Sequence, residues 1–120
     1  MGDYQFIDMS YLEDLALGSN EFKIEMLESF LNTTPESIDK MKGFISNEDW
    51  KGVGAIAHKM KTSFSFVGME NMVQLSKMIQ DLGLAEERTS EIAGMVTELA
   101  DTYKKAEVEL KQELNRLQNS

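Results

Sequence analysis

Residues 55–68 read Ala-Ile-Ala-His-Lys-Met-Lys-Thr-Ser-Phe-Ser-Phe-Val-Gly and contain His58, the only histidine in a chain without cysteine. A helical period of about 100° per residue gathers the apolar side chains of this region on one face and puts His58 on the other. The inward face comprises Val53, Ile56, Met60, Ser63, Phe64 and Val67. The stretch therefore predicts an amphipathic bundle helix that presents an imidazole to solvent.

The face around His58 carries small or cationic side chains, namely Lys51, Gly54, Ala55, Lys61, Thr62 and Ser65. A glycine inside a helix lowers the stability of the helix by about 1 kcal/mol relative to alanine. Gly54 is understandable if a larger side chain beside His58 would obstruct a partner. Lys61 follows His58 by three residues, so its ammonium group lies beside the imidazole and can neutralise an anion there. A lone surface histidine can also be a simple solvated side chain, but these neighbours favour a functional site.

Helical periodicity continues toward the N-terminus. We expect a short helix over residues 8–17 that ends at Gly18, with Ser10 at its start in a capping-box pattern. A longer helix should begin at residue 19 or 20 and run to residue 45, continuous but kinked at Pro35. A second capping box, at Ser46, predicts the start of the helix that carries His58.

Toward the C-terminus, the spacing predicts a helix over residues 69–82 that ends at Gly83. A last helix should run from residue 89 or 90 to residue 118, and its second half is rich in alternating Glu and Lys. No strand-like alternation competes with these helices. The expected fold is therefore all-α, an antiparallel four-helix bundle with a short additional N-terminal helix. We expect one domain over residues 1–120, with its core over about residues 8–117, and a monomer.

Composition narrows the classes of function. The net charge of −9 disfavours binding to nucleic acid, because affinity for the phosphate backbone comes from Lys and Arg. No stretch approaches the roughly 18 consecutive apolar residues of a membrane span, and no cationic start leads into an apolar run. We expect a cytoplasmic protein with no membrane or nucleic-acid partner. The initial Met and polar end favour a free-standing protein over a domain of a larger kinase.

The residues around His58 resemble the phosphoacceptor motif of histidine-containing phosphotransfer (HPt) domains. In that family the usual pattern is His-x-hydrophobic-Lys-Gly-Ser/Ala, followed after a few residues by hydrophobic-Gly. The matching positions are His58, Met60, Lys61, Ser63, Val67 and Gly68. Thr62 departs from the pattern, because the family usually has glycine there. Gln80, between Ile79 and Leu82-Gly83, occupies the position of the family's glutamine that bonds the imidazole.

The resemblance implies a phosphorelay intermediate. His58 would accept a phosphoryl group from the aspartate of a receiver domain and pass it to another receiver, Lys61 would neutralise its charge, and Gln80 would orient the imidazole. Such a chain is a phosphocarrier, not an enzyme with turnover of its own, and needs no cofactor; a divalent metal is expected on the receiver. Its expected partners are response-regulator receiver domains and a hybrid sensor histidine kinase. The expected docking surface comprises Leu12, Phe22, Met26, Gly54, Ala55, Thr62 and Ser65.

The alternative is an HPt-like docking module that binds partners without transferring phosphate. Other classes lack the necessary residues. A metal-binding bundle needs several inward ligands, commonly from Glu-x-x-His motifs, and one outward histidine cannot supply them. A Ser-His-Asp hydrolase needs its serine on a sharp strand-to-helix turn, whereas Ser63 and Ser65 lie on the same helix as His58.

Overall fold

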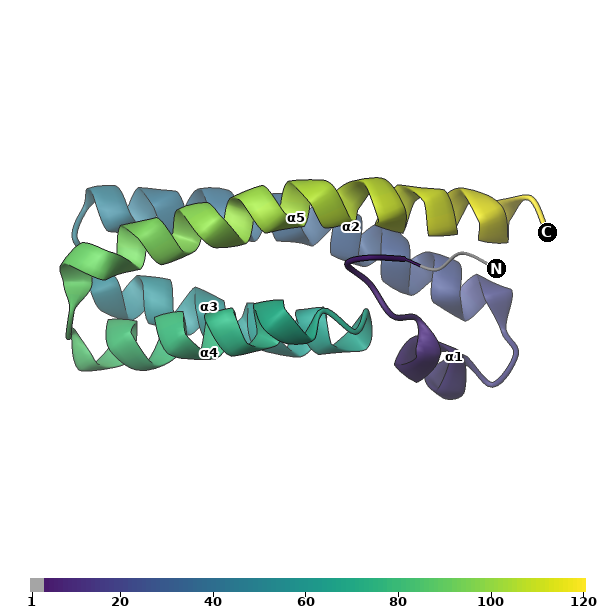
Figure 1. Ribbon diagram of the computed structural model, residues 1–120, viewed down its shortest axis with the longest axis horizontal. Helices are drawn as coiled ribbons and strands as arrows, with labels where there is room; N and C mark the ends of the chain where they lie inside the picture. The colour runs from purple at the N-terminus through teal and green to yellow at the C-terminus, as the bar shows by residue number, and fades with distance from the viewer. Residues whose placement is uncertain (1–3) are drawn as a thin grey trace.

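The computed structural model describes residues 4–120, which form five helices and no strand. These are α1 (Ser10–Ala16), α2 (Asn20–Ser46), α3 (Trp50–Phe66), α4 (Glu70–Ala85) and α5 (Thr89–Gln118). The four long helices lie side by side in a rod of 46 × 21 × 21 Å (Figure 1). α2 and α5 extend past the ends of α3 and α4, and α1 lies beside that extension. The predicted four-helix bundle with a short N-terminal helix is confirmed.

The core runs along the axis of the rod. Helix α2 packs against α3 and α5, and α4 packs against the same two helices, so the four long helices form a closed ring. Phe64 of α3 is fully buried and contacts Phe30 of α2 edge to face, with ring centroids 5.7 Å apart. Aliphatic side chains from every long helix complete the interior, among them Leu27, Met41, Val53, Ile79, Ile92, Leu99 and Leu110. None of the helices formed by residues 4–120 has the length and apolar character that a membrane crossing requires.

The structure corrects two of the predicted helix starts. Ser19 caps α2 as expected, because its hydroxyl accepts a hydrogen bond from the Phe22 amide at 3.1 Å. Ser10 is already inside α1, and its amide donates to the Asp8 carboxylate at 2.9 Å. Ser46 is the last residue of α2, and α3 is capped instead by Asp49, which accepts from the Gly52 amide at 3.0 Å. The predicted serine caps are wrong because a nearby carboxylate already binds the free amides.

Gly83 also differs from its prediction. It does not end a helix, since α4 continues through it to Ala85. A Cβ atom at position 83 would lie 2.6 Å from the Trp50 carbonyl oxygen and 2.9 Å from the Gly54 nitrogen, both on α3. The glycine is therefore needed for the close approach of two helix backbones. Pro35, by contrast, lies within one continuous α2, as predicted.

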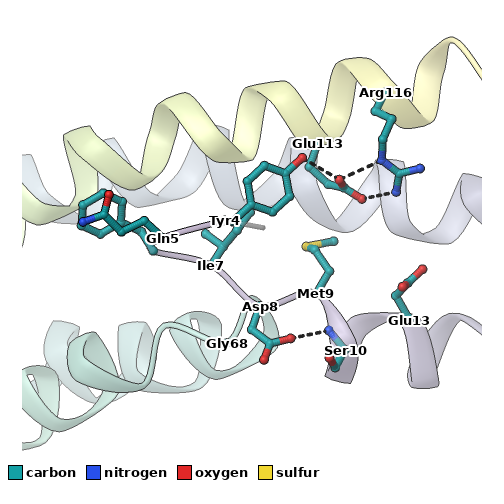
Figure 2. A pocket seen from close by; sticks show the side chains of 11 residues that line it. Tyr4, Gln5, Ile7, Asp8, Met9, Ser10, Glu13, Gly68, Glu113 and Arg116 are labelled. Carbon is teal, nitrogen blue, oxygen red and sulfur yellow. Dashed lines mark hydrogen bonds and ion pairs between the residues drawn. The ribbon is translucent and has the colours of Figure 1, made fainter. Parts of the chain in front are cut away.

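Residues 4–9 form an N-terminal strap along α5. One carboxylate, that of Glu109, accepts hydrogen bonds from the backbone amides of Gln5, Phe6 and Ile7 at 2.8, 2.7 and 3.2 Å. Further along, the Asp8 amide donates to the Val67 carbonyl at 2.9 Å. The strap therefore ties α5 to the end of α3 and delivers α1 beside it. Figure 2 shows the polar hollow of about 720 Å³ that the strap borders.

A buried carboxylate on α5 completes this attachment. Glu113 is 3% exposed and accepts from Tyr4 Oη at 2.9 Å, from Arg116 Nε at 3.0 Å and from Arg116 Nη2 at 2.6 Å (Figure 2). Burial alone would raise the pKa of Glu113, but the hydrogen bonds from Arg116 and Tyr4 outweigh it and lower the pKa below the ordinary value. The ionised form is therefore the one that holds the strap.

The Glu113 attachment predicts a pH-dependent contribution to stability. Because the pKa is lower in the folded state, the stabilisation is fully present above the unfolded value of 4.5 and is lost as the pH falls through the folded value. Replacing Glu113 with Gln should lower the free energy of unfolding by about 1–3 kcal/mol near neutral pH. The difference from wild type should shrink as the pH is lowered below 4.5, measured by urea unfolding. Glu98→Gln, an exposed carboxylate on the same helix, is the control; an equal loss there would contradict the assignment.

Candidate functional site on the outer face of α3

His58 lies on the solvent side of α3, as its sequence pattern predicts. Its side chain is exposed, whereas Val53, Gly54, Ala57, Met60 and Phe64 of the same helix are buried. The buried residues form two stripes, because Val53, Met60 and Phe64 enter the core while Gly54 faces α4. His58 is therefore held by a helix that is packed on two sides, and its backbone position is well defined.

The close contact between α3 and α4 sets what lies next to His58. A Cβ atom at Gly54 would be 2.9 Å from the Leu84 nitrogen and 3.0 Å from the Gln80 carbonyl oxygen. The two helices are antiparallel, so one turn forward from Gly54 to His58 corresponds to one turn back along α4. The turn that contains residues 76–80 is consequently level with the imidazole. Gln80 is half-buried, and its Oε1 is buried without a hydrogen-bond partner among residues 4–120.

The charge beside His58 is positive. Lys61 lies three residues after His58 and is half-buried, and none of the ion pairs formed within residues 4–120 involves it. The exposed Lys59 also lies outside those pairs. Both ammonium groups are therefore available to an anion bound at the imidazole. No group of three or more His, Asp or Glu side chains in residues 4–120 is arranged to hold a metal ion.

An apolar surface lies at the C-terminal end of α3. Tyr11 of α1 is 50% exposed and stacks on Phe66 with ring centroids 5.9 Å apart and an interplanar angle of 24°. Leu15, one turn after Tyr11, is 41% exposed. We call Tyr11, Leu15 and Phe66 the α1 patch. It begins roughly 12 Å beyond His58 along the helix axis, because the two positions are eight residues apart at 1.5 Å per residue.

Comparison with known proteins identifies this arrangement. The family model described as Hpt domain matches residues 25–120, which is most of the chain and includes His58, Lys61 and Gln80. The chain belongs to the Hpt domain family. It is similar to the phosphorelay intermediate protein rdeA of Dictyostelium discoideum, with 29% identity over 73 residues. That match covers 61% of this chain but only 29% of the relative, so the chain spans a minor part of the relative's length. No solved structure matches the chain.

The three predicted phosphotransfer residues lie on α3 and α4, two helices that pack against each other. His58 and Lys61 are one turn apart on α3, and Gln80 is on the facing turn of α4. The predicted hydrogen bond from Gln80 to the imidazole is not formed within the described residues, since Gln80 Oε1 has no partner. The roles of these residues, and the approach of Gln80 to the imidazole, remain predictions.

The predicted docking residues divide into two groups. Ala55, Thr62 and Ser65 are exposed on the His58 face, Phe22 is 37% exposed and Met26 is half-buried. Leu12 and Gly54 are buried, so the prediction that they line a docking surface is wrong. Leu12 is fully buried because it anchors α1 to the bundle, and Gly54 is covered by α4.

The α1 patch is not among the docking residues predicted from the sequence. Tyr11 and Leu15 are four residues apart, which places them together on one side of a helix. This second apolar stripe beside the inward one of Leu12 and Ala16 was the available signal. Helix α1 has only seven residues, and apolar side chains lie on two of its sides. The bundle can cover only one side, so the other remains exposed.

Proposed function

We propose that this Hpt domain is a phosphorelay intermediate in which His58 accepts a phosphoryl group from the aspartyl phosphate of a receiver domain and passes it to a second receiver. The observation that supports the proposal is the exposure of the sole imidazole on α3, one turn from Lys61, on a helix that packs against the one carrying Gln80. The printed name of the Dictyostelium relative supports the same role. A hybrid sensor histidine kinase would supply the phosphoryl group to the first receiver.

The proposed transfer is a direct displacement at phosphorus. The lone pair on His58 Nε2 attacks the phosphorus, the bond from phosphorus to the aspartate oxygen breaks, and the aspartate leaves as a carboxylate. The proton stays on Nδ1, from which Gln80 Oε1 would accept a hydrogen bond, so the product is a phosphorylated imidazolium and no proton is transferred. Transfer to the second receiver reverses these steps and returns a neutral imidazole.

Lys61 would contribute by charge and not by covalent chemistry. The transferred group carries negative charge on its equatorial oxygens, and the chain around it has a net charge of −9. An ammonium group one turn from His58 offsets that repulsion. We assign no metal to this chain; the divalent metal would belong to the receiver, together with the groups that activate its aspartate. The chain is accordingly proposed as a carrier and not as an enzyme.

Docking would use the short side chains around His58 and the apolar surface beyond them. Ala55, Thr62 and Ser65 allow another protein to approach the imidazole closely, although Thr62 adds a methyl group and a hydroxyl where the family usually has glycine. Phe22 and Met26 at the start of α2, with the α1 patch, would provide apolar contact area.

The test is incubation of the full chain with a receiver domain that carries a radiolabelled aspartyl phosphate. We expect label to move to this chain in a form that is labile to acid and stable to base, as a phosphoramidate is. Addition of a second unphosphorylated receiver should then remove the label. Binding to the phosphorylated receiver without transfer would instead support a docking module that no longer carries phosphate.

A further inference from the structure

Lys23, in the first turn of α2, is a buried cation. It is 6% exposed, and its ammonium nitrogen lies 2.8 Å from Glu13 Oε1 on α1. Every other lysine and arginine in residues 4–120 is at least half-exposed or partly exposed. Taking a lysine out of water is unfavourable, and the attraction of one partner returns little more than that loss. The ion pair therefore adds little net stability, and its use is better sought in the placement of α1.

The charges around Lys23 connect α1 with the rest of the chain. Burial raises the pKa of Glu113 on α5, while hydrogen bonds from Arg116 and Tyr4 and the nearby charge of Lys23 lower it. Glu13, Glu113 and Arg116 also line one hollow (Figure 2). Lys23 is therefore close to carboxylates of two other helices, and the one on α1 is its direct partner.

The ion pair and the α1 patch lie on opposite flanks of the buried side of α1. Leu12 and Ala16 make up that buried side. At about 100° per residue, the patch residues of α1 lie on one flank of it and Glu13 lies on the other. One flank is held by stacking on Phe66, with ring centroids 5.9 Å apart, and the other by the ion pair with Lys23. A seven-residue helix has little stability of its own, so these attachments fix the rotation of α1 about its axis.

We propose that Lys23 is a positioning residue for receiver docking, because its ion pair with Glu13 holds the α1 patch in the orientation that a receiver contacts. A typical interface covers about 800 Å² on each partner, and a disc of that area has a radius of about 16 Å. A receiver centred on His58 therefore reaches the α1 patch, which begins roughly 12 Å away along the helix axis. This inference rests on the proposed function, because the receiver is the partner that it names.

The competing explanation is that the stem of Lys23 only covers apolar surface and that its ammonium group meets a carboxylate by chance. Lys23→Met separates the two explanations, because methionine keeps an unbranched apolar stem and removes the charge. A covering role alone predicts that α1 stays in place and that transfer from a receiver is normal. A positioning role predicts a loosened α1 in a protein whose overall stability is unchanged or raised, because a buried charge has been removed.

The direct readout is hydrogen exchange of the α1 amides in the full chain. We expect Lys23→Met to speed their exchange about tenfold, the effect of one charge-assisted hydrogen bond on a local equilibrium, while the α3 amides keep their rates. Glu13→Gln changes a side chain that is 54% exposed and leaves the core intact, and it should have the same effect. The double variant should add little to either single change. Lys42→Met, at an exposed position of the same helix, is the control.

The second readout separates docking from chemistry at the imidazole. We expect Lys23→Met to raise the receiver concentration that gives half-maximal transfer by about tenfold and to leave the rate at saturating receiver unchanged. Labelling of His58 by phosphoramidate, a small donor that does not need α1, should be unchanged. Unaltered exchange of the α1 amides would overturn the inference, and so would an unaltered dependence on receiver concentration. If the wild-type chain accepted no phosphate from a receiver, the proposed function would fail, while hydrogen exchange would still decide whether Lys23 holds α1.

Discussion

Replacing His58 with Gln should abolish labelling by a phosphorylated receiver while leaving the fold intact. The amide of glutamine is not a nucleophile toward phosphorus, and no other imidazole or thiol exists in the chain to replace it. His58 is exposed on α3, so the free energy of unfolding should stay within about 0.5 kcal/mol of wild type. The measurements are radiolabel transfer and urea unfolding of the same preparation.

The control for this experiment is Lys42→Gln, which changes an exposed residue of α2 and leaves the imidazole and the lysines of α3 in place. It should retain acid-labile label. Continued labelling of the His58→Gln variant would move the acceptor elsewhere and refute the proposed function. A loss of several kcal/mol in stability would show that the histidine has a structural role, which its exposure on α3 argues against.

The second large effect is expected at the contact between α3 and α4. Gly83→Ala places a methyl group 2.6 Å from the Trp50 carbonyl oxygen and 2.9 Å from the Gly54 nitrogen, and backbone atoms cannot move aside as a flexible side chain does. Gly54→Ala has the same consequence from the other helix, at 2.9 Å from the Leu84 nitrogen. Each variant should lose about 1–3 kcal/mol in the free energy of unfolding, because the helices must separate.

Two other helical glycines provide the controls. Nothing lies within 4 Å of a Cβ atom added at Gly43 of α2 or at Gly94 of α5. Alanine there should stabilise the protein by about 0.5–1 kcal/mol through helix propensity alone. The change in the free energy of unfolding therefore has opposite signs at the packed and the open glycines, which distinguishes the effect of close packing from that of helix propensity. Equal stabilisation at all four positions would show that the α3–α4 contact is loose. It would also remove the support for placing Gln80 near His58.

The relation between α3 and α4 also connects stability with function. Separating the two helices moves Gln80 away from the level of His58, so Gly83→Ala should slow phosphotransfer even at temperatures where the variant is fully folded. Gly94→Ala should not, because α5 does not carry a proposed site residue. The phosphotransfer rate of folded protein, corrected for the fraction unfolded, is the quantity to compare.

Local sequence information was sufficient wherever one side chain or one periodic stripe decides the outcome. The inward face of α3 includes Val53, Met60 and Phe64 as the spacing predicted, and Ser19 caps α2. The exposure of His58 follows from the same stripe, because an amphipathic helix has only one apolar side to bury. The all-α bundle likewise follows from helical periodicity along nearly the whole chain.

The predictions were wrong where a residue type that is typical of one local structure serves a different purpose in the packing of elements distant in sequence. In sequence, Gly83 looks like the end of a helix and Gly54 looks like space left for a partner. In the structure, each glycine allows the backbone of the other helix to approach closely. Ser10 and Ser46 match a capping pattern, but the Ser10 amide is bound by Asp8, and Asp49 caps α3. Leu12 resembles a surface residue of a short helix until α1 is docked and covers it completely.

By itself, the sequence determined the fold class, the solvent-facing position of His58 and the proximity of Lys61, because residues within two turns of one helix have a fixed geometry. Only the tertiary structure decided that the Gln80 backbone packs against Gly54, that Gly54 is closed to partners, and that Tyr11 stacks on Phe66. These facts depend on how far α3 and α1 slide along their neighbours, and that register is set by side chains distant in sequence. The helical periodicity of a sequence does not determine the register between two packed helices.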